Sequence, residues 1–225
     1  MTPDVASPTS DPRASEAACS ADTALEPAGA GEGLWQLILS DIRRKQEHYV
    51  LVNRFFNKYV KILMQHGTIA VVVYRLGHFA YTRRSLLARW FWLLVYKFFA
   101  LPVTWISRIH INPRVAIGRG FVIHNFSLVF IDARRIGSNF TINQGVTVGP
   151  DYHLDGLPSL GDNVFIGAGA CLLGAIDIGD NVVVAANCFV ARSLESNCVA
   201  AGCPGRIVMR GIEPDYVGNV PAHLR

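Results

Sequence analysis

Residues 136–190 read IGSNFTINQGVTVGPDYHLDGLPSLGDNVFIGAGACLLGAIDIGDNVVVAANCFV, and an aliphatic residue occupies every sixth position of this segment. An amphipathic helix repeats at about 3.6 residues and a half-exposed strand at about 2, so neither explains this period. A coil of three short strands, each one hexapeptide long, does explain it. The sequence therefore predicts a parallel β-helix with these side chains inside: Ile136, Ile142, Val148, Leu154, Leu160, Ile166, Leu172, Ile178, Val184 and Val190.

The repeat extends upstream with a change of register. The six-residue spacing continues through Ile111, Ile117, Ile123 and Val129. The step from Val129 to Ile136 is one residue too long, and we expect a bulge at a corner to absorb the extra residue. Coils of three hexapeptides then predict about five coils over 111–195.

One segment keeps the six-residue count but loses the composition of the repeat. Residues 149–159 read GPDYHLDGLPS, with Pro, Asp and Gly where strands avoid them. We therefore predict a loop that leaves the β-helix, although Leu154 is in phase. Loops that interrupt a regular solenoid are where function usually lies.

Composition divides the chain into four parts. Residues 1–33 hold six acids, one Arg and few large apolar residues, which predicts a disordered tail without a secretory signal. Residues 34–105 show helical spacing, and we expect two to four helices that end before Pro102. Residues 106–210 form the β-helix domain, and 211–225 form a C-terminal tail.

Charge and aromatic residues concentrate in the helical part. Residues 34–225 carry twenty Lys and Arg against eleven acids. Residues 83–105 are apolar and rich in Trp and Phe, but Arg89, Lys97 and Pro102 interrupt them, so we do not expect a spanning helix. Peripheral membrane contact is one interpretation. The other, which we favour, is packing against the first coil or a neighbouring subunit. No nucleic-acid motif accompanies the bases, so we expect no nucleic-acid partner.

The five cysteines form no CxxC pair, so the sequence supports neither a disulfide framework nor a metal site. This cysteine usage favours a reducing compartment. We expect a cytoplasmic protein, and the alternative is a cytoplasmic protein held at the inner face of the membrane.

Three histidines and one arginine are candidates for chemistry, and the weakest of them is His110, just before the repeat. His124 directly follows the inward Ile123, so its ring should point outward at a corner, where a neutral imidazole can take a proton from an alcohol. A hydrogen bond to a neighbouring carbonyl is the alternative role. His153 lies in the predicted loop, either lining a cleft or solvated. Arg206 follows the small residues that end the repeat, where it could bind phosphate or simply belong to an exit turn.

Four motifs carry a family resemblance: IGRGFVIH (117–124), INQGVTVG (142–149), the segment 161–190 and AAGCPGRIV (200–208). They resemble the hexapeptide-repeat acyltransferases, and within them the serine O-acetyltransferases and the colanic-acid type acetyltransferases of exopolysaccharide clusters. The resemblance implies a left-handed parallel β-helix, a homotrimer with active sites between adjacent prisms, and acetyl-CoA as donor.

The resemblance also assigns residues. It implies that His124 is the general base. His153 is a further catalytic candidate from its place in the loop, and we expect no metal. The positions that match the family's coenzyme A groove and its pantetheine and phosphate end are Ala168, Ala186, Ala201, Gly202 and Arg206.

Three departures from the serine acetyltransferase pattern bear on the acceptor. Ile123, His110 and Leu157 stand where that family typically has two Asp and a second His. His153 or Asp132 could replace the missing partner of the base. A pocket without those charged groups should discriminate weakly for serine, so we predict O-acetylation of a sugar hydroxyl in polysaccharide biosynthesis. The alternatives are a serine O-acetyltransferase, a non-catalytic trimeric scaffold, and a carbonic-anhydrase-like site that would need three converging His.

Overall fold

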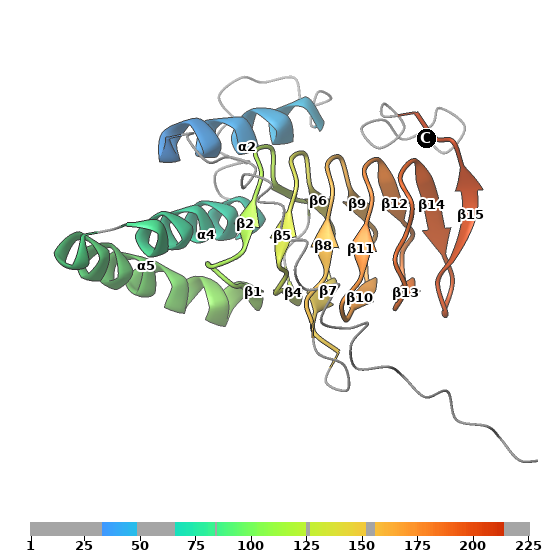
Figure 1. Cartoon of the computed structure of the whole chain (residues 1–225). Coiled ribbons are helices and arrows are strands. Elements are labelled where there is room, and N and C mark those ends of the chain that lie inside the picture. Colours follow the sequence, from blue (N-terminus) through green and yellow to red (C-terminus); the bar gives the residue numbers. More distant parts are fainter. Residues whose placement is uncertain (1–32, 49–65, 84, 125–126, 152–155, 214–225) are drawn as a thin grey trace, which may run out of the picture.

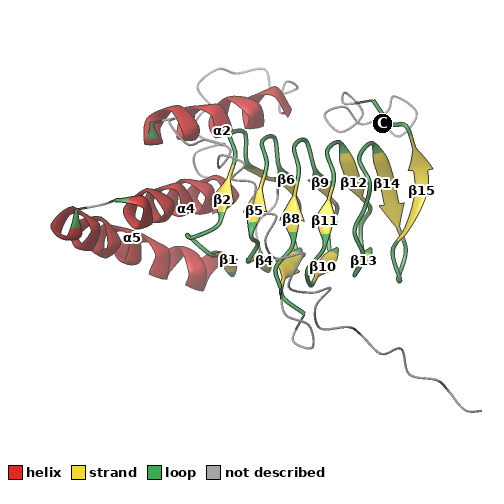
Figure 2. Ribbon diagram, in the orientation of Figure 1, coloured by secondary structure: helices red, strands yellow, loops and turns green. Residues whose placement is uncertain are grey.

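The computed structural model describes residues 33–48, 66–83, 85–124, 127–151 and 156–213. In this part of the chain, three helices precede fifteen short strands (Figure 1, Figure 2). The strands wind into a prism with three parallel sheets, and the helices lie at the end of the prism opposite β15. The predicted parallel β-helix is confirmed.

The strands belong to three sheets, here named A, B and C. Sheet A contains β1 (Ile109–Ile111), β4 (Val129–Ile131), β7 (Thr147–Gly149), β10 (Cys171–Leu173) and β13 (Phe189–Val190). Sheet B contains β2 (Ala116–Ile117), β5 (Arg135–Ile136), β8 (Ser159–Leu160) and β11 (Asp177–Ile178). Sheet C contains β3 (Val122–Ile123), β6 (Thr141–Ile142), β9 (Phe165–Ile166), β12 (Val182–Val184), β14 (Cys198–Ala201) and the antiparallel β15 (Arg206–Arg210).

The predicted inward register is confirmed by burial and pairing. Within the described residues from Ile136 to Val190, every in-phase aliphatic side chain is buried. Ile142 pairs with Ile166, and Ile166 pairs with Val184, so the in-phase side chains of successive coils stack on one another. Each fully buried side chain of this size stabilises the fold by about 1.5–3 kcal/mol, which explains why the six-residue period dominates the sequence.

The register change lies earlier than the sequence predicted. Ile131, not Val129, pairs with Ile111 and Val148 as the in-phase residue of β4. The extra chain is therefore inserted before β4, at the corner that follows His124, and not between Val129 and Ile136. Ser127 and Leu128 have φ values of 114° and 55° at this corner. Val129 is nonetheless buried as the partner of Ile109, which is why the pattern seemed to continue through it.

The loop predicted at residues 149–159 interrupts the strands between β7 and β8. Ile136 pairs with Leu160, a full hexapeptide more than the usual coil, so one hexapeptide is excluded from the strands. Leu154 and His153 lie outside the described residues. The predicted interruption of the repeat is confirmed, although its two end residues belong to strands, Gly149 to β7 and Ser159 to β8.

The described helices are α2 (Leu34–His48), α4 (His66–Thr82) and α5 (Leu86–Ser107). The expectation that the helices end before Pro102 is wrong, because α5 continues through Pro102 to Ser107. Proline removes one backbone donor, but the following turn still forms and ends at Arg108, whose N–H donates to Thr104 O at 3.0 Å. Only one residue then separates α5 from β1.

Helix α5 has a packed face and an open face. Trp92 contacts Phe79 of α4 edge to face, with ring centroids 5.4 Å apart, and Val103 packs against the core. On the other face Trp90 and Phe98 are exposed. Packing of these rings against the first coil is therefore wrong for Trp90 and Phe98, whereas the other half of that interpretation, packing against a neighbouring subunit, stays a prediction.

Candidate active site

The residue that follows each in-phase aliphatic of sheet C lies at the edge of the prism where the chain turns toward sheet A. Ile123, Ile142, Ile166, Val184 and Ala200 pair in succession across this sheet. The next residue of each coil therefore stacks along the same edge. We call this line of residues the site edge; it consists of His124, Asn143, Gly167, Ala185 and Ala201.

Backbone hydrogen bonds fix the order of the site edge. The His124 N–H donates to Ile142 O at 3.0 Å, and the Gly167 N–H donates to Val184 O at 2.8 Å. Ala185 continues the ladder, with its N–H 2.9 Å from Ala200 O. Since neighbouring strands lie about 4.8 Å apart, His124 and Ala201 are separated by about 19 Å along this edge.

The residues predicted to bind coenzyme A meet on or beside this edge. Ala168 and Ala186 directly follow Gly167 and Ala185 and are half-buried and exposed, respectively. Ala201 and Gly202 end the edge at the last coil. Arg206, with an exposed side chain, pairs with Ala201 across the antiparallel β14–β15 pair. The structure thus brings His124 and all five of these positions onto one side of the prism.

Small residues leave the backbone accessible in the middle of the site edge. A Cβ added at Gly167 would lie 2.5 Å from the Ala186 backbone N, so no other residue fits there without moving the next coil. Ala168 and Ala186 project only methyl groups. An extended ligand can therefore approach the backbone along this part of the edge.

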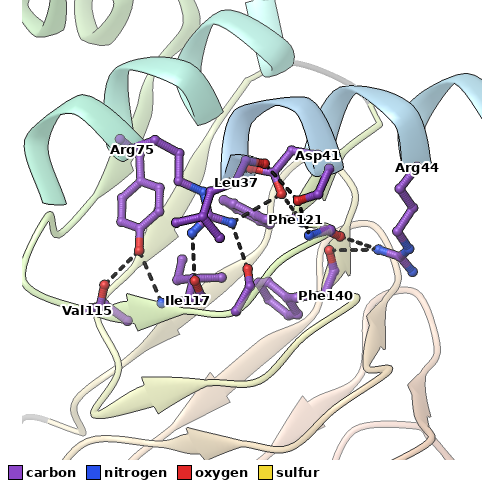
Figure 3. A network of polar contacts seen from close by, with 12 residues as sticks. Leu37, Asp41, Arg44, Arg75, Val115, Ile117, Phe121 and Phe140 are labelled. Atoms are coloured by element: carbon purple, nitrogen blue, oxygen red, sulfur yellow. Dashed lines mark hydrogen bonds and ion pairs between the residues drawn. The ribbon is translucent and has the colours of Figure 1, made fainter. Parts of the chain in front are cut away.

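The helices hold the coil that leads to His124. Asp41 and Arg75 form a buried ion pair with Nε to Oδ2 at 2.9 Å (Figure 3). Arg75 also donates to the carbonyl oxygens of Ile117 and Gly118, each at 2.6 Å. The Asp41 carboxylate accepts the Phe121 N–H at 2.8 Å. The backbone of the first coil is therefore fastened to α2 and α4 on its way to the site edge.

A buried lysine reaches the residue next to His124. The Lys45 Nζ donates to Ile123 O and to Thr68 Oγ1, both at 2.8 Å. Ile123 is fully buried, and His124 itself is half-buried. A Cβ at Gly67 would lie 2.8 Å from the same Ile123 carbonyl, so α4 approaches this carbonyl as closely as a glycine allows. Lys45 therefore helps to fix the backbone from which His124 projects.

Sequence reasoning missed Asp41, Lys45 and Arg75 as parts of this site. Lys45 and Arg75 count there only among the twenty bases of residues 34–225, and Asp41 among the eleven acids. The one available signal was the position of Asp41 and Lys45 four residues apart, in line with Leu37, on the apolar face of α2.

Burial lowers the pKa of Lys45 to about 8. A neutral amine has two N–H groups, which match its two acceptors, whereas the charged form has a third donor. Because the folded chain binds fewer protons than the unfolded chain between about pH 8 and 10.5, the stability contributed by Lys45 rises with pH through this window.

We expect the stability difference between the natural protein and a Lys45→Met variant to grow with pH in favour of the natural protein. The growth should be about 2 kcal/mol between about pH 7 and pH 9.5. Urea unfolding of both proteins at each pH measures it, and all other titrating groups cancel in the difference. A difference that stays constant with pH would show that Lys45 keeps its proton in the folded chain.

The remaining sequence candidates lie elsewhere or outside the described residues. His110 stacks on Phe130 across sheet A, with ring centroids 5.4 Å apart. Asp132 follows Ile131 and accepts a hydrogen bond from Asn112 Nδ2, so within one chain it lies at a different edge from His124. His153 is not among the described residues, and the described residues contain no group of three His, Cys, Asp or Glu placed to hold a metal ion.

A groove of about 490 Å³ follows another edge, where sheet B turns toward sheet C. Asp177, Asp180, Glu195 and Arg135 line it, and two of these carboxylates form ion pairs, Asp177 with Arg134 and Glu195 with Arg210. The groove therefore has no surplus of positive charge for the phosphate groups of coenzyme A. The site edge, which ends at Arg206, suits an anionic ligand better.

Comparisons with known proteins show the family to which the chain belongs. The family model described as bacterial transferase hexapeptide (six repeats) matches residues 158–192. The serine acetyltransferase of Helicobacter pylori strain J99 is 34% identical over 157 residues, which cover 68% of this chain and 88% of that protein. The chain is a hexapeptide-repeat acyltransferase of the serine acetyltransferase family. The serine acetyltransferase of Staphylococcus xylosus is 42% identical over 103 residues, 44% of this chain and 48% of that protein.

Solved structures extend the comparison to the fold of this acyltransferase. The serine acetyltransferase of Brucella abortus strain S19 in complex with coenzyme A is 25% identical, with a TM-score of 0.67 over 82% of this chain and 71% of that one. The Vibrio cholerae enzyme, 22% identical with a TM-score of 0.70 over 85% of this chain and 72% of that one, shows the fold alone. The prism is the left-handed β-helix of this family, as the sequence predicted.

Proposed function

We propose that this acyltransferase moves the acetyl group of acetyl-CoA to the hydroxyl of L-serine. The observation that carries the proposal is the match to a serine acetyltransferase over 88% of that relative's length. The coenzyme A complex of the Brucella abortus relative supports the choice of donor. This reverses the preference for a sugar acceptor that the missing charged residues suggested.

In the proposed reaction His124 removes the proton of the acceptor hydroxyl as its oxygen attacks the thioester carbonyl carbon. The carbon–sulfur bond then breaks, coenzyme A leaves as a thiolate, and the proton on His124 passes to the sulfur. The negative charge on the carbonyl oxygen needs N–H donors nearby. No acyl-enzyme is required, because binding both substrates on one edge supplies proximity.

We place coenzyme A along the site edge, with the thioester near His124. The pantetheine arm would follow the small residues Ala168 and Ala186, and a phosphate would approach Arg206 beyond Ala201 and Gly202. The estimated length of the edge, about 19 Å over four strand spacings, gives the arm an extended path. A guanidinium suits a phosphate at its end.

A homotrimer would complete this site. An edge of a prism is convex, so one chain offers a substrate a single wall, and a second copy packed alongside would make the edge into a cleft. His153 and the rest of the loop would then belong to the mouth of that cleft. We propose this assembly from the convex shape of the edge and from the family to which the chain belongs.

A sugar hydroxyl is the second candidate acceptor. Serine carries an ammonium and a carboxylate, and serine acetyltransferases typically bind these groups with charged side chains. Here Ile123 is buried in the core and Leu157 is half-buried, and neither can pair with a charge. A sugar would need no such partners.

The test is the release of free thiol from acetyl-CoA by the full chain, with L-serine, a panel of sugars, and L-alanine as the control without a hydroxyl. We expect turnover that depends on L-serine, with half-saturation in the millimolar range because charged contacts are few. Turnover with sugars but not with serine would favour the second candidate. A chain that neither binds coenzyme A by calorimetry nor releases thiol would be a scaffold.

A further inference from the structure

Helix α5 carries an unpartnered apolar stripe along its whole length. Trp90 is 73% exposed, and the other large exposed residues recur every three or four positions, which places them on one face. The stripe consists of Leu87, Trp90, Leu94, Phe98, Leu101 and Trp105. By length and composition α5 is the one described helix that could cross a membrane, and none of its most apolar window is buried.

Basic residues accompany this stripe. Arg83 precedes α5, Arg108 follows it, and Lys97 lies on the helix itself; all three are exposed. The sequence contains no Asp or Glu between Glu47 and Asp132, a stretch with eleven Lys and Arg. The surface around α5 therefore combines aromatic side chains with positive charge alone.

The connections of α5 decide how it could meet a membrane. Its other face packs along α4, and only Arg108 separates it from β1, so both ends remain tied to the folded domain (Figure 1). Arg89 and Lys97 also interrupt the helix, and charged side chains are costly at the centre of a bilayer. These features favour a helix that lies in the headgroup layer and does not span the membrane.

We propose that α5 docks this acyltransferase on the surface of an anionic lipid bilayer, with its apolar stripe in the headgroup layer. Trp and Tyr side chains are favoured at this depth, and nearby Lys and Arg are attracted to anionic headgroups. A second copy of the same face is a poorer occupant, because two-fold pairing would bring these bases close to the bases of the other copy without any acid of this stretch between them.

The experiment is co-sedimentation of the full chain with two kinds of vesicle. One is phosphatidylcholine alone, and the other contains about a third phosphatidylserine. We expect binding to the anionic vesicles at about 0.1 M salt, with weaker binding at about 0.5 M salt and on neutral vesicles. A folded chain that stays in solution with both vesicles would overturn the proposal.

Matched variants locate the contact. The double variant Trp90→Glu, Phe98→Glu should weaken binding to anionic vesicles by about tenfold or more. Trp35→Glu is the control, since Trp35 is 74% exposed on α2, away from α5, and should leave binding unchanged. Equal binding by the double variant would place the contact elsewhere. If the double variant instead lowered the oligomer size seen by light scattering, the stripe would be an interface between copies.

Discussion

Replacing His124 with Ala should lower the rate of acetyl transfer by about two to four orders of magnitude, which is the usual contribution of a general base. The side chain projects from the site edge at a corner, while its backbone N–H stays in the ladder with Ile142 O. Removing the imidazole should therefore leave the β-helix folded. Thiol release from acetyl-CoA measures the effect, and circular dichroism and light scattering check the fold and assembly.

His78→Ala is the matched control for this variant. His78 is a half-buried histidine of α4 whose Nδ1 lies 3.0 Å from Pro113 O, away from the site edge, so its loss should change the transfer rate per folded chain little. The pH profile adds a second readout, because the rate should fall as the imidazole of His124 becomes protonated. A folded His124→Ala protein with nearly unchanged turnover would remove His124 from the role of base.

The core of the β-helix could be predicted from the sequence because its signal is local and repeated. Each inward position, such as Ile166, must be apolar in every coil, so the period itself identifies the buried residues. The place of the register change could not be predicted. Val129 and Ile131 are both buried in β4, and only pairing with Ile111 shows which one continues the stack.

The site edge could also be anticipated, since the residue after each in-phase aliphatic of one sheet must fall at one edge. That rule brings His124, Gly167 and Ala185 together without coordinates, and Ala168 and Ala186 directly follow the last two. The ion pair and hydrogen bonds by which Asp41 and Arg75 hold the first coil, here called the clamp, could not be found in this way. Asp41 and Arg75 are far apart in sequence from each other and from the first coil. An exposed Asp–Arg ion pair would consist of the same two residue types, so the sequence does not distinguish the two cases. Only their burial reveals their role.

Replacing Arg75 with Leu should destabilise the protein by about 3–5 kcal/mol, because removing one partner of a buried pair leaves an uncompensated charge. Arg75 is 1% exposed and Asp41 is 4% exposed. The variant loses both hydrogen bonds to Asp41 and those to the carbonyls of Ile117 and Gly118. Urea unfolding at a fixed protein concentration measures the loss, since the measured stability of an oligomer depends on concentration.

Two comparisons separate the buried charge from other effects of this substitution. The double variant Arg75→Leu, Asp41→Leu should recover part of the lost stability, because no charge then remains buried without a partner. Arg134→Leu breaks an exposed ion pair to Asp177, 3.4 Å long, and should cost less than about 1 kcal/mol. Equal costs for Arg75→Leu and Arg134→Leu would mean that water reaches the Asp41 carboxylate.

The same variant tests whether the clamp positions the base. Arg75 fixes the carbonyls of Ile117 and Gly118, and the coil from there leads directly to His124, whereas Ala186 lies on a coil distant from the helices. If the clamp sets the geometry of His124, the folded fraction of Arg75→Leu should show a lower kcat with an unchanged KM for acetyl-CoA. If it contributes stability alone, kcat per folded chain should equal that of the natural protein.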